Sequence, residues 1–150
     1  MMKPAKFISV ALMLMLIVGN LQMSTANPPS ELNSLEQLQW EHRVIIINTN
    51  THDSKSIEET IRTQKPEIDD RHIVWFIVSR QAETIDITSN YLGTLSRSFH
   101  KEVVSFVNED HKRVTLIGKD GGIKAQSSSL NLNDIFALID TMPMRISEMK

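Results

Sequence analysis

Residues 73–78 read Ile-Val-Trp-Phe-Ile-Val, and residues 44–47 read Val-Ile-Ile-Ile. Continuous runs of β-branched and aromatic residues are typical of strands that are buried on both faces of a sheet. These two runs therefore predict two buried strands, and they decide the fold class.

The segment between the two runs predicts a helix. Asp53–Lys65 carries Ile57 and Ile61 at helical spacing among polar residues. Thr51, Asp53 or Ser54 can cap its start, and Pro66 is expected to end it. A strand, a helix and a strand in this order favour parallel pairing of the two strands.

The second half of the chain predicts two more helices and a hairpin. Apolar residues at helical spacing predict helices over 94–107 and 131–142, the second capped by Asn131 and stopped by Pro143. Strands are expected over 113–118 and 123–126, joined by a tight turn because Asp120-Gly121 favours positive φ.

The resulting order is β-α-β-α-β-β-α, which predicts an α/β fold with a mixed sheet and helices on both faces. This order is the one expected of a thioredoxin-like fold. Fold alone carries no function.

The composition limits the chemistry that is open to the chain. Its 150 residues include no cysteine, so disulfides, thiol catalysis and thiolate metal sites are excluded. The formal net charge of −2 argues against binding to nucleic acid, which favours basic surfaces.

The first 26 residues are interpreted as a secretory signal peptide. Lys3 and Lys6 precede an apolar run over 7–18, and Ser24-Thr25-Ala26 supplies small residues for cleavage. A membrane anchor is the alternative, but the run is shorter than the roughly 20 apolar residues that a spanning helix needs. We expect a secreted, periplasmic protein with no membrane attachment after cleavage.

Cleavage after Ala26 removes two lysines and no acid, which changes the net charge from −2 to −4. The expected organisation is a signal peptide over 1–26, an extended leader over 27–34 and one thioredoxin-like domain over 35–150. A chain of this size can bury its own core.

Three motifs resemble a thioredoxin-like domain of unknown function. They are Trp-Glu-His-Arg at 40–43, Leu-Ile-Gly-Lys-Asp-Gly-Gly-Ile-Lys at 116–124, and Met-Pro-Met-Arg at 142–145, followed by Glu148 and Met149. The family it resembles occurs in bacterial secreted proteins and in two animal matrix proteins, coiled-coil-domain-containing protein eighty and sushi-repeat-containing X-linked protein. The resemblance implies a thioredoxin-like fold, secretion and no established reaction.

The chain departs from thioredoxins where their chemistry lies. Their reactive thiol stands between the first strand and the first helix, where residues 48–53 here read Asn-Thr-Asn-Thr-His-Asp. Their cis-proline before the third strand is also missing, because residues 108–113 contain no proline. Thiol oxidoreductase and thiol peroxidase activities are therefore excluded for this chain.

His52 is the candidate catalytic residue, with Thr49, Thr51 and Ser54 as candidate binding residues. Free backbone N–H groups at the start of a helix favour an anion and disfavour an imidazolium. This predicts an anion or carboxylate site beside a neutral His52. The alternative is a polar loop whose threonines and Asp53 only cap the helix.

Arg43, Lys119 and Arg145 are further candidate binding residues. The two arginines either pair with acids such as Asp140 or Glu148 and join the chain ends, or bind a carboxylate or phosphate of a partner. Lys119 lies in the predicted hairpin turn, which lacks the glycine spacing of a phosphate-binding loop.

Metal binding is not expected. The five histidines form no close ligand pair on one helix. Met142, Met144 and Met149 suggest reduced copper through thioether ligands, but methionines also fill gaps beside a core. A copper-binding protein remains an alternative.

The leading hypothesis is a secreted binding or accessory module without thiol chemistry, without a cofactor and with a protein or a small anionic ligand as its partner. The main alternative is an enzyme that uses His52 as a base. The sequence favours no particular reaction.

Overall fold

The computed structural model describes residues 30–107 and 113–150, and the predicted signal peptide lies outside the described residues. In chain order the elements are β1 (Glu31–Leu32), η1 (Leu35–Leu38), β2 (Arg43–Asn50), α1 (Thr51–Thr63), α2 (Lys65–Asp70), β3 (Ile73–Gln81), β4 (Thr84–Ser89), β5 (Thr94–Leu95), α3 (Arg97–Ser105), β6 (Val114–Ile117), β7 (Ile123–Ser127), α4 (Leu132–Asp140) and α5 (Pro143–Glu148).

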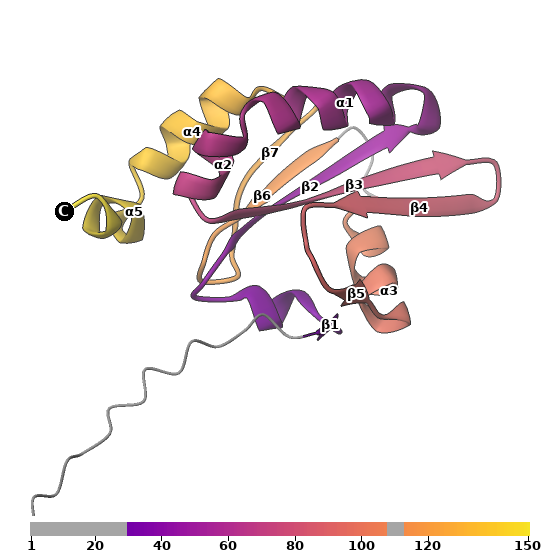
Figure 1. The fold of residues 1–150 in the computed structure, drawn as a ribbon, viewed down its shortest axis with the longest axis horizontal. Helices are drawn as coiled ribbons and strands as arrows, with labels where there is room; N and C mark the ends of the chain where they lie inside the picture. Colours follow the sequence, from indigo (N-terminus) through magenta and orange to yellow (C-terminus); the bar gives the residue numbers. More distant parts are fainter. Residues whose placement is uncertain (1–29, 108–112) are drawn as a thin grey trace, which may run out of the picture.

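The main sheet has five strands in the order β4-β3-β2-β6-β7 (Figure 1). The two predicted buried strands, β2 and β3, pair in parallel, with Val44 opposite Val74. The pairs β3–β4, β2–β6 and β6–β7 are antiparallel, so the sheet is mixed as predicted.

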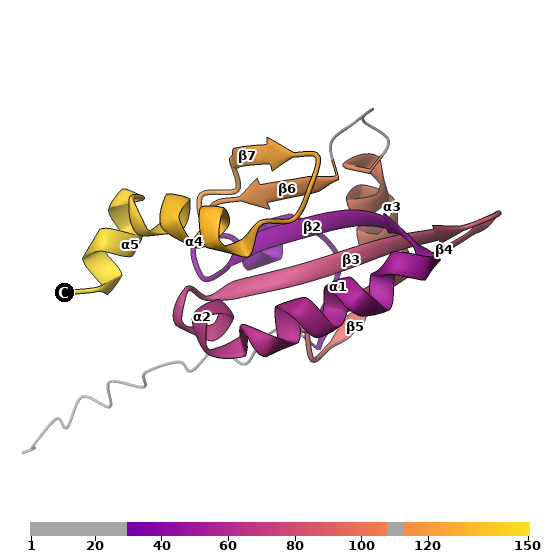
Figure 2. The ribbon, with the colours of Figure 1, turned by 90° about the horizontal axis from the view of Figure 1, so that it is seen from above.

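Helices cover both faces of this sheet (Figures 1 and 2). Successive residues of a strand point to opposite faces. Ile45 and Ile47 of β2 therefore pack with α1, α2 and α4 in one apolar cluster, whereas Val44 and Ile46 pack with η1 and α3 in the other. Both clusters are closed to water, which explains why the β2 and β3 sequences show no polar alternation.

The sequence analysis missed the edge strand β4. Only Ile85 and Ile87 are apolar in this strand, and both pack against the cluster on the α3 side. The turn between β3 and β4 includes Ala82 at a positive φ of 49°. Alanine rarely adopts this conformation, so its presence did not predict a turn.

Both prolines that were expected to end helices begin new ones. The first helix ends at Thr63, and Pro66 lies in the first turn of α2. The last predicted helix ends at Asp140, and Pro143 is the first residue of α5. Proline suits these positions because the first helical residues need no N–H donor within the helix.

The predicted hairpin between β6 and β7 is present, but its connection is longer than a two-residue turn. Residues 118–122 link the strands, and the Gly118 N–H donates to the Gly122 carbonyl oxygen at 2.9 Å. Gly121 adopts a φ of 78°, which only glycine enters without strain.

The segment expected to be an extended leader contains β1, which pairs in parallel with β5. The predicted helix over 94–107 accordingly begins only at Arg97. Within 30–107 and 113–150, no helix combines the length and hydropathy needed to cross a membrane.

Candidate functional site

The predicted site residues lie at opposite ends of β2. Arg43 is the first residue of this strand and Thr49 is near its last. Eight residues of extended chain place the two ends about 23 Å apart. Arg43, Lys119 and Arg145 therefore gather in one region, and Thr49, Thr51, His52 and Ser54 gather in another.

Arg43 and Lys119 share one carboxylate. Arg43 Nη1 lies 3.2 Å from Glu148 Oε2, and Lys119 Nζ lies 2.7 Å from Glu148 Oε1. Both cationic side chains are more than nine-tenths buried, and Arg43 also donates to the Arg71 carbonyl oxygen at 2.8 Å. The arrangement joins the start of β2, the β6–β7 turn and α5.

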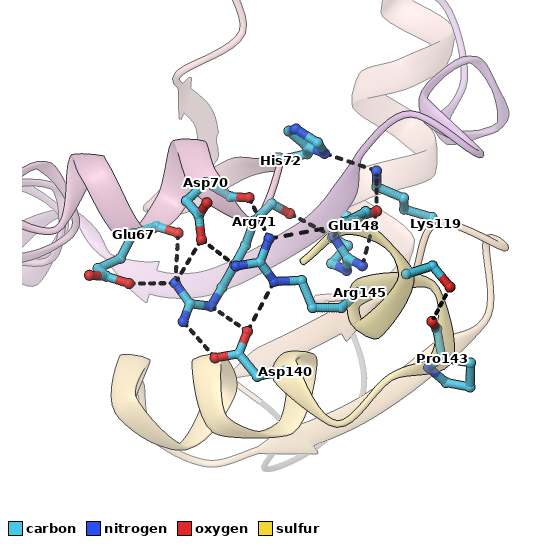
Figure 3. A network of polar contacts seen from close by, with 11 residues as sticks. Glu67, Asp70, Arg71, His72, Lys119, Asp140, Pro143, Arg145 and Glu148 are labelled. Atoms are coloured by element: carbon cyan, nitrogen blue, oxygen red, sulfur yellow. Dashed lines mark hydrogen bonds and ion pairs between the residues drawn. The ribbon is translucent and has the colours of Figure 1, made fainter. Parts of the chain in front are cut away.

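Lys119 also contacts the ring of His72, whose Nδ1 lies 2.9 Å from Lys119 Nζ (Figure 3). An ammonium group can only donate, so Nδ1 must accept and the ring proton must be on Nε2. His72 itself has a positive φ of 51° at the start of β3, which places its ring beside the lysine.

Two further buried arginines extend the network (Figure 3). Arg71 donates to both carboxylate oxygens of Asp140, at 3.0 and 2.6 Å, and also pairs with Glu67. Arg145 donates to Asp140 at 3.1 Å and pairs with Asp70. We call these residues, together with Arg43, Lys119 and Glu148, the ion cluster.

The ion cluster favours the ionised form of its acids. Burial opposes ionisation of Glu148, but hydrogen bonds from Lys119 and Arg43 outweigh it and lower the Glu148 pKa. Hydrogen bonds from Arg71 chiefly lower the pKa of Asp140. At neutral pH both acids are therefore charged, which matches the buried cations around them.

A cavity of about 500 Å³ adjoins the ion cluster, between the β6–β7 turn and the α4–α5 link. We call it the C-terminal cavity. Its lining residues are Arg43, Gly118, Lys119, Asp120, Lys124, Leu138, Thr141, Met142, Pro143 and Met144. One wall is therefore apolar, whereas the other carries cations.

The cationic wall has an excess of positive charge. In the part of the chain that the structure describes, Glu148 is the one acid paired with Arg43 and Lys119. The other acid of the wall, Asp120, is paired with Lys124 at 2.6 Å, so it does not balance either of these two cations. Within the described residues, Arg43 Nε also has no hydrogen-bond partner, although it is buried. A buried donor without an acceptor is costly, and an incoming anion could lower that cost.

The second group of predicted residues surrounds the start of α1. Thr51 donates to the Arg80 carbonyl oxygen at 3.4 Å, and Ser54 donates to the Thr51 carbonyl oxygen at 2.9 Å. Asn50 caps the helix by accepting from the Asp53 N–H at 2.9 Å. His52 is exposed and lines neither the C-terminal cavity nor the two hollows beside Thr49. Thr49, in contrast, is buried and lines two cavities.

The three methionines proposed as copper ligands do not line one cavity together. Met142 and Met144 line the C-terminal cavity, whereas Met149 is exposed beyond α5 and is not part of its wall. Met142 packs against the core, which is the gap-filling role considered above. Across residues 30–107 and 113–150, no group of three histidines or acids is placed to hold a metal ion.

The sequence analysis offered pairing of Arg43 and Arg145 with acids such as Asp140 or Glu148 as one of two alternatives, without assigning a partner to either arginine. In the structure Arg43 pairs with Glu148 and Arg145 pairs with Asp140. The sequence analysis missed Arg71 and Asp70, which lie just before a buried strand and resemble an ordinary polar loop. It also missed His72. Their position could have indicated a structural role. Charged residues that directly flank a buried strand lie close to the elements that cover the end of that strand, and they need partners there.

These features define an α/β domain with a mixed sheet, no cysteine and a buried ion cluster at one end. The chain belongs to the family described as Domain of unknown function (DUF4174), whose family model matches residues 34–148. Membership of a family of unknown function was expected from the motifs. No curated protein and no solved structure matches the chain.

Proposed function

We propose that this protein is a secreted thioredoxin-like binding module that has no thiol chemistry and holds an anionic ligand in the C-terminal cavity. One observation carries the proposal: buried Arg43 and Lys119 stand at the wall of an apolar cavity with a single carboxylate between them. The periplasm is the proposed compartment, supported by the signal-like sequence of residues 1–26.

The strand arrangement supports the thioredoxin-like relation. A parallel β2–β3 pair linked by helices, followed by antiparallel β6 and β7 on the other side of β2, matches the predicted order once β4 is added at the edge. The relation to the bacterial secreted and animal matrix proteins rests on the three sequence motifs. Residues 48–53 contain no sulfur, which supports binding without thiol redox chemistry.

The cavity favours a ligand with an anionic head and an apolar body. Leu138, Met142 and Met144 offer apolar contacts. Burial of apolar surface contributes a favourable free energy of about 25 cal/mol per Å². The cations at the opposite wall favour a carboxylate, because charge-assisted hydrogen bonds are strong where water is excluded. A medium-chain carboxylate combines both parts.

Calorimetric titration of the secreted chain with decanoate, decanol and acetate tests this proposal. Decanoate should bind measurably tighter than decanol, which has no charge, and tighter than acetate, which has no apolar body. Lys119→Gln should weaken decanoate binding about tenfold, because a hydrogen bond to a charged group contributes about 1.5–3 kcal/mol.

Lys124→Gln is the matched control for this substitution. Lys124 also lies at the cavity, but it is paired with Asp120 and is more exposed than Lys119. Its removal should change decanoate affinity less than threefold. Equal binding of decanoate and decanol, or equal losses in the two lysine variants, would contradict the proposal.

Of the alternatives, the enzyme based on His52 gains no support from the site. The imidazole is exposed on the first turn of α1, and no described residue hydrogen-bonds to its ring to orient it as a base. Copper binding likewise gains no support, because Met149 lies outside the cavity wall.

A further inference from the structure

Thr49 carries a buried hydroxyl group without a partner. Its side chain lies on the same face of β2 as Ile45 and Ile47, towards α1, and the residue is 6 % exposed. Within 30–107 and 113–150, Thr49 Oγ1 makes no hydrogen bond. A valine would fill the same space without this cost, so folding alone does not favour threonine here.

A cavity of about 350 Å³ with Thr49 in its wall lies at the carboxyl end of β2. Its lining residues are Ile47, Asn48, Thr49, Asp53, Ser56, Ile57, Arg113, Val114, Ser128, Ser129 and Leu130. A second hollow shares Asn48, Thr49 and Arg113 with it. Ligands of α/β proteins bind preferentially at the carboxyl ends of strands, which is where these hollows open.

Both signs of charge line this cavity. Arg113 precedes β6, is exposed and forms no ion pair with any described residue. Asp53 belongs to the first turn of α1, where its carboxylate accepts a hydrogen bond from Asn50 Nδ2 at 3.1 Å. The same wall also includes Thr49 and the apolar residues Ile47 and Ile57.

We propose that this cavity binds a small zwitterion with an apolar side chain, of the class of free aliphatic amino acids. Arg113 takes the carboxylate, because a guanidinium group binds a carboxylate in two parallel hydrogen bonds. Asp53 takes the ammonium group, the Thr49 hydroxyl group donates to the carboxylate, and the isoleucines contact the side chain. The site is separate from the C-terminal cavity and does not depend on its ligand.

The experiment is a titration of the full chain, followed by NMR at the backbone amides of residues 49–53. L-leucine is the probe, and 4-methylpentanoate and isopentylamine are its analogues without the ammonium group and without the carboxylate. L-leucine should produce saturable shifts, and each analogue should bind at least tenfold more weakly. Absence of saturable shifts with L-leucine would overturn the proposal.

Substitutions at Thr49 separate binding from stability. Thr49→Val should weaken L-leucine binding about tenfold without lowering the melting temperature, because it removes a hydroxyl group that has no partner. Thr49→Ser keeps the hydroxyl group and should bind as the wild type does.

Substitution of arginines tests which group binds the carboxylate. Arg113→Gln should weaken binding of L-leucine and of 4-methylpentanoate, but should not change binding of isopentylamine. Arg97→Gln, an exposed arginine on α3, is the matched control and should leave all three unchanged. Unaltered L-leucine binding in both Thr49→Val and Arg113→Gln would place the ligand elsewhere and overturn the proposal.

Discussion

At the scale of single residues, Glu148 neutralises two buried cations at once. Among the carboxylates of residues 30–107 and 113–150, it alone contacts both Arg43 and Lys119, and its own side chain is 21 % exposed. Two buried cations are tolerated beside each other only if an anion lies between them. The stability of this end of the molecule therefore depends on the charge of one side chain.

Glu148→Gln should lower the free energy of unfolding by about 3 kcal/mol at neutral pH, because it leaves two buried cations without their shared anion. Urea denaturation measures this loss. Glu59→Gln changes an exposed acid on α1 and should cost less than about 0.5 kcal/mol. Equal stability of the two variants would show that Glu148 has no special role.

The pH dependence of stability follows from the same group. The folded-state pKa of Glu148 is lowered below its ordinary value of 4.5, so its contribution is complete above that value and is lost as the pH falls through the folded pKa. The wild type should lose stability below about pH 5, whereas Glu148→Gln should lose less over the same range. Denaturation curves at successive pH values measure both slopes, and parallel slopes would contradict the assignment.

His42 adds a second titration at higher pH. Burial chiefly lowers its pKa below the ordinary value of 6.5, so the folded state disfavours the imidazolium form. Stability should therefore begin to fall as the pH drops below 6.5, before Glu148 is protonated. His42→Gln should flatten this part of the curve, and denaturation curves of wild type and variant between about pH 5 and about pH 7 measure the difference; an unchanged slope would contradict the assignment.

Sequence reasoning at this scale predicted pairs better than networks. Pairing of Arg43 and Arg145 with acids such as Asp140 or Glu148 could be predicted in general terms, but the partner of each arginine could not. Arg71 reaches Asp140 across 69 positions of sequence, and nothing local indicates that contact. Likewise, the missing partner of Thr49 is a property of its surroundings, which sequence does not describe.

At the scale of elements, the β6–β7 connection depends on one glycine. A methyl group on Gly121 would lie 2.2 Å from the Gln39 side chain, and the residue has a φ of 78°. Gly121→Ala should lower the free energy of unfolding by about 1–2 kcal/mol, because non-glycine residues are strained in this region.

Gly122→Ala is the control within the same connection. The nearest atom to its added methyl group would be 3.5 Å away, and its φ is not positive. It should cost no more than about 0.5 kcal/mol. Thermal denaturation of both variants distinguishes them, and equal losses would show that the left-handed conformation is not the cause.

The elements themselves differed in how far sequence could predict them. β2, β3 and α4 were predictable because burial on both faces, or on one helical stripe, leaves a continuous apolar pattern. β4 lies at the edge, where alternate residues face water, and its two isoleucines are too few to form a pattern. The roles of Pro66 and Pro143 were wrong because proline suits the start of a helix as well as its end.

At the scale of the whole molecule, the ion cluster ties the first half of the domain to the last. Asp70 and Arg71 belong to the β2–α2–β3 region, whereas Asp140, Arg145 and Glu148 come from α4 and α5. Arg145→Gln should lower the free energy of unfolding by about 3 kcal/mol, because it breaks buried ion pairs.

Hydrogen exchange can show whether the ion cluster couples α2 to α5. Hydrogen exchange should accelerate in α2 as well as in α5 when Arg145 is replaced. Lys65→Gln removes an exposed pair with Asp69 on α2 and should change stability by less than about 1 kcal/mol. Faster exchange confined to α5 would show that the cluster does not couple the two halves.

The central position of β2 has a consequence for how the chain reaches this structure. β2 is made early, but its neighbour β6 begins only at Val114, some 70 positions later in the chain. Until then one edge of β2, which carries the apolar run Val44–Ile47, has no partner, and such edges recruit strands from other molecules. Contacts over such long separations also form slowly. We therefore expect a nascent chain of this protein to bind chaperones until β6 has been synthesised and can pair with β2.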